Sequence, residues 1–119
     1  MWIYTKDGFL SVVEDKDDRM GRWLYVRSRE PIVFNELFPN HEIIELTEAD
    51  YPFRIHILKI DFCEAIADLI CEIDYPNFKD QVLKDSPYLF QAYSGVYGQT
   101  LKLENCHGNG SPIMGLVEN

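Results

Sequence analysis

The stretch MWIYTKDGFLSVVE, residues 1–14, decides the fold. Two runs rich in β-branched and aromatic residues, 1–6 and 9–14, lie on either side of the pair Asp7-Gly8. Aspartate followed by glycine supports the positive φ angles of a tight hairpin turn. The sequence therefore predicts that the first two strands pair antiparallel.

Three more segments have the composition of strands, at 22–28, 42–46 and 53–59. The first and the last alternate, with apolar side chains on one face and Trp23, Tyr25, Arg54 and His56 on the other. The first continues the hairpin as a meander, and the other two are expected to form a second hairpin around the turn at 47–52. Between the hairpins, residues 30–38 are expected to form a short helix, because proline is tolerated in a first helical turn and Pro39 stops the segment.

The remaining chain has helical periodicity as far as residue 101. Asp61 is expected to cap the best helix, with Glu64 three residues later as in a capping box. The apolar stripe of this helix contains Phe62, Ile66, Leu69, Ile70 and Ile73. Pro76 ends it, residues 77–84 form a short second piece, and Ser86-Pro87 begin a last helix.

Five strands followed by helices that each carry one apolar stripe predict an α+β fold in two layers. The expected architecture is a five-stranded antiparallel sheet with the C-terminal helices packed on one face, while the other face carries Arg, His and aromatic side chains. Residues 1–104 are predicted to form one domain. Residues 105–119 hold three glycines and a proline without periodicity, and they are predicted to be a flexible tail.

The composition excludes several classes of function. Eleven Lys and Arg against twenty Asp and Glu give a net charge of −9, which repels a nucleic-acid backbone and argues against nonspecific binding of DNA or RNA. This acidity indicates a basic partner, mimicry of nucleic acid, or a solubilising surface. No apolar run approaches the length of a membrane span, the N-terminus lacks the basic start of a signal peptide, and three cysteines without framework spacing fit a reducing compartment. We therefore expect a cytoplasmic protein.

The sequence predicts no catalytic residues, no cofactor and no metal site. The segment that begins at Asp15 resembles a calcium loop, but Met20 stands where glycine is needed and Val26 where glutamate is needed. His and Cys residues are scattered without the spacing of zinc ligands, and Cys63 and Cys71 are expected to be small core or boundary residues. Nothing places a nucleophile beside a base.

The candidate ligand site is a basic and aromatic set in a protein that is short of positive charge: Arg27, Arg29, Tyr51 and Arg54, with Asp50 beside it. If the third and fifth strands expose these groups on one face, the guanidinium groups can hold a carboxylate or phosphate through paired hydrogen bonds. The alternative is that they pair with nearby acids such as Glu45 and Glu48 across the strands.

The chain also resembles a family of short uncharacterised bacterial and phage proteins over residues 1–97. The residues that carry the resemblance are Met1-Trp2, Gly8-Phe9, Ser11-Val12-Val13, Val26-Arg27-Ser28-Arg29, Leu37-Phe38-Pro39, Ala49-Asp50-Tyr51 with Arg54, and above all Ile73-Asp74-Tyr75-Pro76-Asn77-Phe78-Lys79. Two departures are Tyr93 to Tyr97, where the family often has a tryptophan, and the segment after Asn105, which the family usually lacks. The resemblance implies a bacterial or phage origin and supplies no mechanism.

The resemblance directs attention to the family motif, Asp74, Tyr75, Asn77, Phe78 and Lys79. A structural role for this run is a helix break in which Asp74 caps the next segment and Phe78 enters the core. The function predicted first is a non-catalytic protein-interaction module that, if phage-borne, modulates a host factor. The alternative is a module for small anions, or a small enzyme, that uses the face with Arg27 and Arg54 and has Asp50 or Asp74 as a base.

Overall fold

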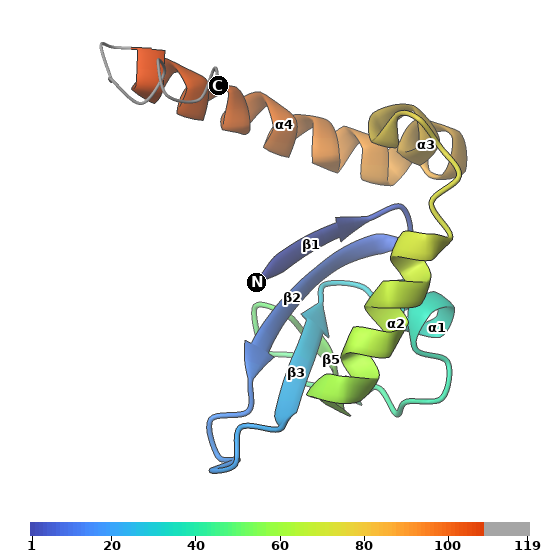
Figure 1. Ribbon diagram of the computed structural model, residues 1–119, viewed down its shortest axis with the longest axis vertical. Coiled ribbons are helices and arrows are strands. Elements are labelled where there is room, and N and C mark those ends of the chain that lie inside the picture. Colours follow the sequence, from blue (N-terminus) through green and yellow to red (C-terminus); the bar gives the residue numbers. More distant parts are fainter. Residues whose placement is uncertain (109–119) are drawn as a thin grey trace. The chain divides into compact units, whose positions relative to one another are not determined.

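The computed structural model describes residues 1–108, with side chains as far as residue 103. The chain divides into two compact units, Met1–Pro76 and the segment that begins at Asn77. The first unit holds a five-stranded antiparallel sheet with the strand order β1-β2-β3-β5-β4 (Figure 1). The strands are β1 (Trp2–Thr5), β2 (Gly8–Glu14), β3 (Trp23–Ser28), β4 (Ile44–Glu45) and β5 (Phe53–Leu58). The predicted α+β fold with an antiparallel sheet is confirmed.

The turn after β1 consists of Lys6 and Asp7, one residue earlier than the predicted pair Asp7-Gly8, and Gly8 is already the first residue of β2. Of the two residues of the predicted pair, only Gly8 has a positive φ. Thr5 lies opposite Gly8, and the Thr5 hydroxyl donates to the Gly8 carbonyl at 2.8 Å while it accepts from the amides of Asp7 and Gly8. Gly8 has φ +154°, a conformation that side chains other than glycine rarely adopt. The side-chain hydroxyl thus satisfies the backbone of a turn that glycine makes possible.

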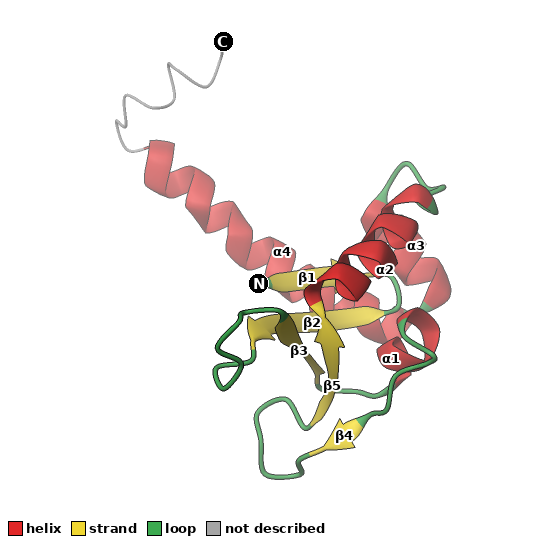
Figure 2. Cartoon of the chain, turned by 60° about the horizontal axis from the view of Figure 1, so that its bottom comes forward, coloured by secondary structure: helices red, strands yellow, loops and turns green. Residues whose placement is uncertain are grey.

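Helices α1 (Ile32–Leu37) and α2 (Lys59–Cys71) cover one face of the sheet, which we call the inner face (Figure 2). Alternate residues of β2, β3 and β5 point to this face, and they form the core with residues of both helices. The core residues are Leu10, Val12, Val26, Val33, Phe34, Phe38, Ile55, Ile57 and Phe62. Each buried Leu, Ile, Val or Phe side chain contributes roughly 1.5–3 kcal/mol of transfer free energy, so this cluster is the main source of stability of the first unit.

Helix α2 begins three residues earlier than predicted, and the predicted cap at Asp61 is wrong. The N-cap is Leu58, which makes no side-chain cap, and Asp61 lies in the first turn. The strand β5 runs directly into the helix. The Lys59 amide donates to the carbonyl of Arg22, the residue before β3, at 2.8 Å, and so extends the pairing of β5 with β3 by one residue. Tertiary pairing therefore replaces the local capping signal.

The stripe predicted for α2 is buried only at its start. Phe62 is 7% exposed, whereas Ile70 and Ile73 are 60% and 50% exposed, and Ile73 lies beyond the end of the helix. Cys63 and Cys71 are both exposed, so their assignment to the core or its boundary is wrong. The helix contacts the sheet mainly near its N-terminus, where β5 fixes its position.

The segment that begins at Asn77 contains α3 (Phe78–Asp85) and α4 (Pro87–Gly108). Asn77, rather than the predicted Asp74, caps α3, because its side chain accepts a hydrogen bond from the Asp80 amide at 3.0 Å. Phe78 stacks on Tyr93 at 5.8 Å between ring centroids. Helix α4 continues four residues into the segment predicted as a tail, and residues 109–119 lie outside the described residues. Within residues 1–108 no helix has the length and apolar character that a membrane span requires.

Candidate functional site

The face of the sheet opposite α1 and α2, the outer face, carries the polar and aromatic side chains of the first unit. The alternation predicted for β3 and β5 is confirmed, since Val26, Ile55 and Ile57 are buried in the core while their neighbours Arg27, Arg54 and His56 are only half-buried. Within the unit Met1–Pro76, both helices lie on the inner face (Figure 1). The outer face is therefore the place where the first unit presents functional groups.

Two arginines lie directly opposite each other on this face. Arg27 of β3 pairs with Arg54 of β5 in the antiparallel register. Like charges at directly opposed positions destabilise a sheet, because the side chains lie about 5 Å apart at Cβ. Arg27 Nη2 donates to Ser11 Oγ at 2.8 Å, so the Arg27 guanidinium leans over β2 and away from Arg54. Arg54 Nη2 donates to the Tyr51 carbonyl at 3.3 Å.

Tyr51 joins the arginines into one site, and we call Arg27, Arg29, Tyr51 and Arg54 the arginine–tyrosine face. The guanidinium carbons of Arg27 and Arg29 lie 4.8 and 5.1 Å from the Tyr51 ring centroid. The guanidinium of Arg54 lies 5.8 Å from the ring of Tyr25. The aromatic rings thus hold the cations by cation–π attraction, which leaves the N–H groups in the guanidinium planes available to a ligand.

No carboxylate neutralises these arginines among the side chains of residues 1–103. The ion pairs of that part of the chain join Lys6 to Asp7, His56 to Asp15 and Lys59 to Glu14. The alternative that the arginines pair with Glu45 or Glu48 is therefore wrong for the described residues, and Asp50 makes no ion pair there either. The Nε atoms of Arg27 and Arg54 are buried without a hydrogen-bond partner. Buried donors without partners are costly, and among the described side chains His41 Nδ1 is the one other buried atom in this state.

A histidine–aspartate pair lies beside the arginine–tyrosine face. His56 Nε2 is 2.9 Å from Asp15 Oδ2. Trp23 stacks on the His56 ring at 4.5 Å with an interplanar angle of 12°, and Tyr25 contacts the same ring at 4.8 Å. Sequence reasoning missed this pair because Asp15 and His56 are 41 residues apart. His56 lies at an outer-face position of β5 and Asp15 directly follows β2, and no sequence motif connects the two positions.

The loop from Asp15 to Trp23 uses its carboxylates for its own backbone. Asp18 accepts from the amides of Met20, Arg22 and Trp23, at 3.2, 2.7 and 3.0 Å. Desolvation raises the pKa of Asp18, but hydrogen bonds from these amides, first that of Arg22, outweigh it and hold the pKa below its ordinary value. These bonds account for the acidic residues that resemble a calcium loop. Among the described side chains, no three His, Cys, Asp or Glu are grouped to hold a metal ion.

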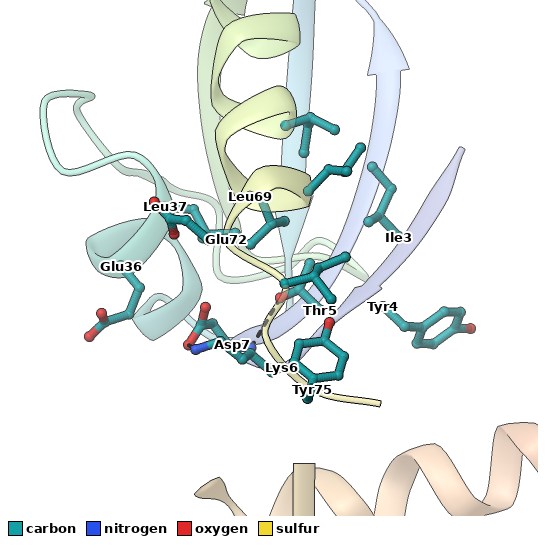
Figure 3. Close-up of a pocket in the computed structure, with 13 residues that line it drawn as sticks. Ile3, Tyr4, Thr5, Lys6, Asp7, Glu36, Leu37, Leu69, Glu72 and Tyr75 are labelled. Carbon is teal, nitrogen blue, oxygen red and sulfur yellow. Dashed lines mark hydrogen bonds and ion pairs between the residues drawn. The ribbon is translucent and has the colours of Figure 1, made fainter. Parts of the chain in front are cut away.

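Two hollows border the inner face and offer less chemistry. One has a volume of about 350 Å³ and is lined by apolar residues of β1, α1 and α2 and by Lys6, Asp7, Glu36, Glu72 and Tyr75. Figure 3 shows Glu36 pointing outward and Tyr75 next to Thr5 and Lys6, while Lys6 pairs with Asp7. The other, of about 570 Å³, has an almost wholly apolar lining from α2 and strands β1 to β3. Neither contains a set of converging, unpaired polar groups.

The residues of the family motif belong to both units of the chain, Asp74 and Tyr75 to the first and Asn77, Phe78 and Lys79 to the second. Tyr75 lines the first of these hollows, and Asp74 is exposed. Asn77 caps α3, Phe78 stacks on Tyr93, and Lys79 Nζ lies 4.1 Å from the ring centroid of Tyr97. Asn77 thus begins α3, while Phe78 and Lys79 pack α3 against α4.

Comparisons of the chain with protein-family models, with curated proteins and with solved structures find no match. The resemblance to short bacterial and phage proteins stays a prediction.

Proposed function

We propose that this protein is a binding module that holds an anionic group, a carboxylate or a phosphate, on the arginine–tyrosine face. The observation that carries the proposal is the opposed pair Arg27 and Arg54, which has no carboxylate partner among the described residues and leaves two buried Nε atoms without a hydrogen bond. A bound anion would offset the repulsion between the two guanidinium groups.

The chemistry of the groups supports an anion in preference to other ligands. Guanidinium groups stay charged at all physiological pH values and bind planar carboxylates or phosphate oxygens with two parallel hydrogen bonds. Three of them share one aromatic neighbourhood here, and the rings restrict their motion. The protein-interaction module predicted from the sequence is compatible with this site, because acidic side chains of a protein partner are one source of carboxylates.

The proposal excludes catalysis as the main role of this face. His56 and Asp15 are bonded to each other, and Tyr25 contacts both the His56 ring and the Arg54 guanidinium. We assign this pair the role of supporting the rings of Trp23 and Tyr25.

The test is calorimetric titration of the full chain with inorganic phosphate, pyrophosphate and malonate. We expect pyrophosphate to bind, and a concentration of 100 times its Kd should raise the free energy of unfolding by about 2.7 kcal/mol. Arg29→Ala and Arg54→Ala should each weaken binding, since a hydrogen bond to a charged group contributes about 1.5–3 kcal/mol.

The matched control is Arg19→Ala, which removes the same charge from the exposed loop before β3. It should leave the affinity nearly unchanged. Equal losses from Arg19→Ala and Arg54→Ala would mean that only net charge matters. No binding of any of the three anions would contradict the proposal.

A further inference from the structure

From the arrangement of rings beside the arginines, we infer that the anion bound at this face belongs to a mononucleotide, whose base stacks on Trp2 while its phosphates bind Arg27 and Arg29. The inference rests on the proposed anion site and names its ligand class. Its grounds are the register of the sheet, a continuous series of aromatic contacts, and the charge of the first unit.

One row of residues crosses the whole sheet on the outer face. The register places Trp2 opposite Ser11, Ser11 opposite Arg27, and Arg27 opposite Arg54. The hydrogen bond to Ser11 brings the Arg27 guanidinium over β2, one strand spacing, about 4.8 Å, from the strand that carries Trp2. The strand that carries Trp2 is therefore the neighbour of the strand over which the Arg27 guanidinium lies.

Aromatic contacts connect the two ends of this arrangement. Phe9 lies 6.0 Å from Trp2, 4.7 Å from Tyr4 and 6.2 Å from Tyr51, measured between ring centroids. Tyr51 in turn contacts the guanidinium groups of Arg27 and Arg29. Trp2 meets Phe9 in a T-shaped contact, at 73°, and is 67% exposed, so at least one face of its indole is not covered by that contact.

An exposed indole beside a group of cations matches a ligand that has a planar ring next to an anion. Bases stack on aromatic side chains whatever their identity, because every base has a π-face. A simple carboxylate or inorganic phosphate would use the arginines and leave Trp2 in water. A nucleoside phosphate uses both.

The charge of the first unit favours one nucleotide over a polynucleotide. Residues 1–76 contain eight Lys and Arg against sixteen Asp and Glu, a net charge of −8. A long polyanion would extend beyond the three arginines into this negative field, and each added phosphate would be repelled. A mononucleotide places its charge only where the cations are.

The test compares ligands that separate the ring from the anion, titrated calorimetrically into the full chain with EDTA present. We expect ADP to bind about tenfold or more tightly than pyrophosphate, as stacking of a base on an aromatic ring predicts. Adenosine, which lacks phosphate, should bind far more weakly than ADP. Trp2→Leu should lower the affinity for ADP to that for pyrophosphate and leave the affinity for pyrophosphate unchanged.

The matched variant Trp23→Leu removes the other tryptophan of the outer face, which is already stacked on His56. Trp23→Leu should still bind ADP more tightly than pyrophosphate by the wild-type factor, and Trp2→Phe should keep most of that difference in affinity. Pyrophosphate binding with no gain for ADP would overturn the nucleotide assignment and leave the anion site standing, whereas failure of both ligands would overturn the anion site. If Trp23→Leu, and not Trp2→Leu, abolished the higher affinity for ADP, the proposed position of the base on Trp2 would be overturned. Affinity that increases with the length of an oligonucleotide would overturn the restriction to a mononucleotide.

Discussion

At the residue scale, Gly8 is the position among the described glycines where a side chain would fit least well. A Cβ at this position would lie 2.8 Å from Val33 Cβ, in addition to the strain of φ +154°. Val33 is buried in α1 and cannot move aside. We expect Gly8→Ala to lower the free energy of unfolding by roughly 2–4 kcal/mol, the sum of backbone strain and overpacking, measured by urea denaturation.

Two other glycines provide controls for this prediction. Gly21 has φ +65°, but its nearest non-neighbour atom would be 3.5 Å from a Cβ, so Gly21→Ala should cost only the strain, about 1–2 kcal/mol. Gly95 lies in α4 with nothing within 4 Å of a Cβ, and Gly95→Ala should stabilise by up to about 1 kcal/mol. If Gly8→Ala cost no more than Gly21→Ala, close packing against Val33 would not be the reason for glycine.

Asp18 should make stability depend on acid pH. Its folded-state pKa lies below the ordinary value of 3.8, so the stabilisation is present above that value and is lost as the pH falls through the folded pKa. We expect Asp18→Asn to be less stable than the wild type at neutral pH, and the difference to disappear in strong acid. Denaturation across this pH range, with NMR titration of the carboxyl group, measures both.

The control for Asp18 lies in the same loop. The amides of Met20, Arg22 and Trp23 donate to Asp18, and the carboxylate of Asp17 accepts none of these hydrogen bonds. Asp17→Asn should therefore show no comparable loss at neutral pH. If NMR titration gave Asp18 a pKa at or above 3.8, the amide hydrogen bonds would not be stabilising its carboxylate as described.

At the element scale, the opposed arginines of the proposed site should lower the stability of the pairing between β3 and β5. Arg54→Met keeps an unbranched side chain but removes the repulsion with Arg27 and the unpartnered Nε atom. We expect the free energy of unfolding to stay the same or rise by up to about 1 kcal/mol in low salt without multivalent anions. Pyrophosphate should stabilise the wild type and not this variant.

Arg19→Met serves as the reference for that substitution, because it changes the same charge in an exposed loop. A loss of more than about 1 kcal/mol in Arg54→Met alone would show that the arginine stabilises the sheet, and the argument for a ligand would weaken.

Helix α2 should depend on one residue for its attachment. Phe62 is 7% exposed and stacks on Phe38 at 5.8 Å, whereas Ile70, two turns later, is 60% exposed. We expect Phe62→Ala to cost about 3–5 kcal/mol and Ile70→Ala less than about 0.5 kcal/mol, measured by chemical denaturation. Similar costs at both positions would mean that the whole stripe is buried, as the sequence had predicted.

At the scale of the whole molecule, the arginine–tyrosine face is a small positive region in an acidic protein. Glu64→Lys and Asp68→Lys on the exposed side of α2 each raise the net charge by two, from −9 to −5 together. We expect the double variant to bind pyrophosphate with a faster association rate and a nearly unchanged dissociation rate, because distant charges steer encounters without contacting the ligand.

Stopped-flow measurements at several salt concentrations test this. The difference in association rate between the double variant and the wild type should shrink as the salt concentration rises. At 0.1 M the Debye length is about 10 Å, so charges farther from the ligand than this are largely screened. The exchange of Glu64 and Asp68 for Gln and Asn, which raises the net charge by one at each position, should give an intermediate rate. A change confined to the dissociation rate would indicate that α2 contacts the ligand.

The sequence by itself determined the strands, their order along the chain and the two faces of the sheet, because alternation and the turn signal Asp7-Gly8 are local properties. It also named Arg27, Arg29, Tyr51 and Arg54 as a set. Only the tertiary structure decided the register that opposes Arg27 to Arg54, the pairing of Asp15 with His56, and the start of α2 at Lys59 rather than after Asp61. These depend on contacts between residues that are distant in the chain, and in such contacts long-range pairing outweighs a local capping preference of about 1 kcal/mol.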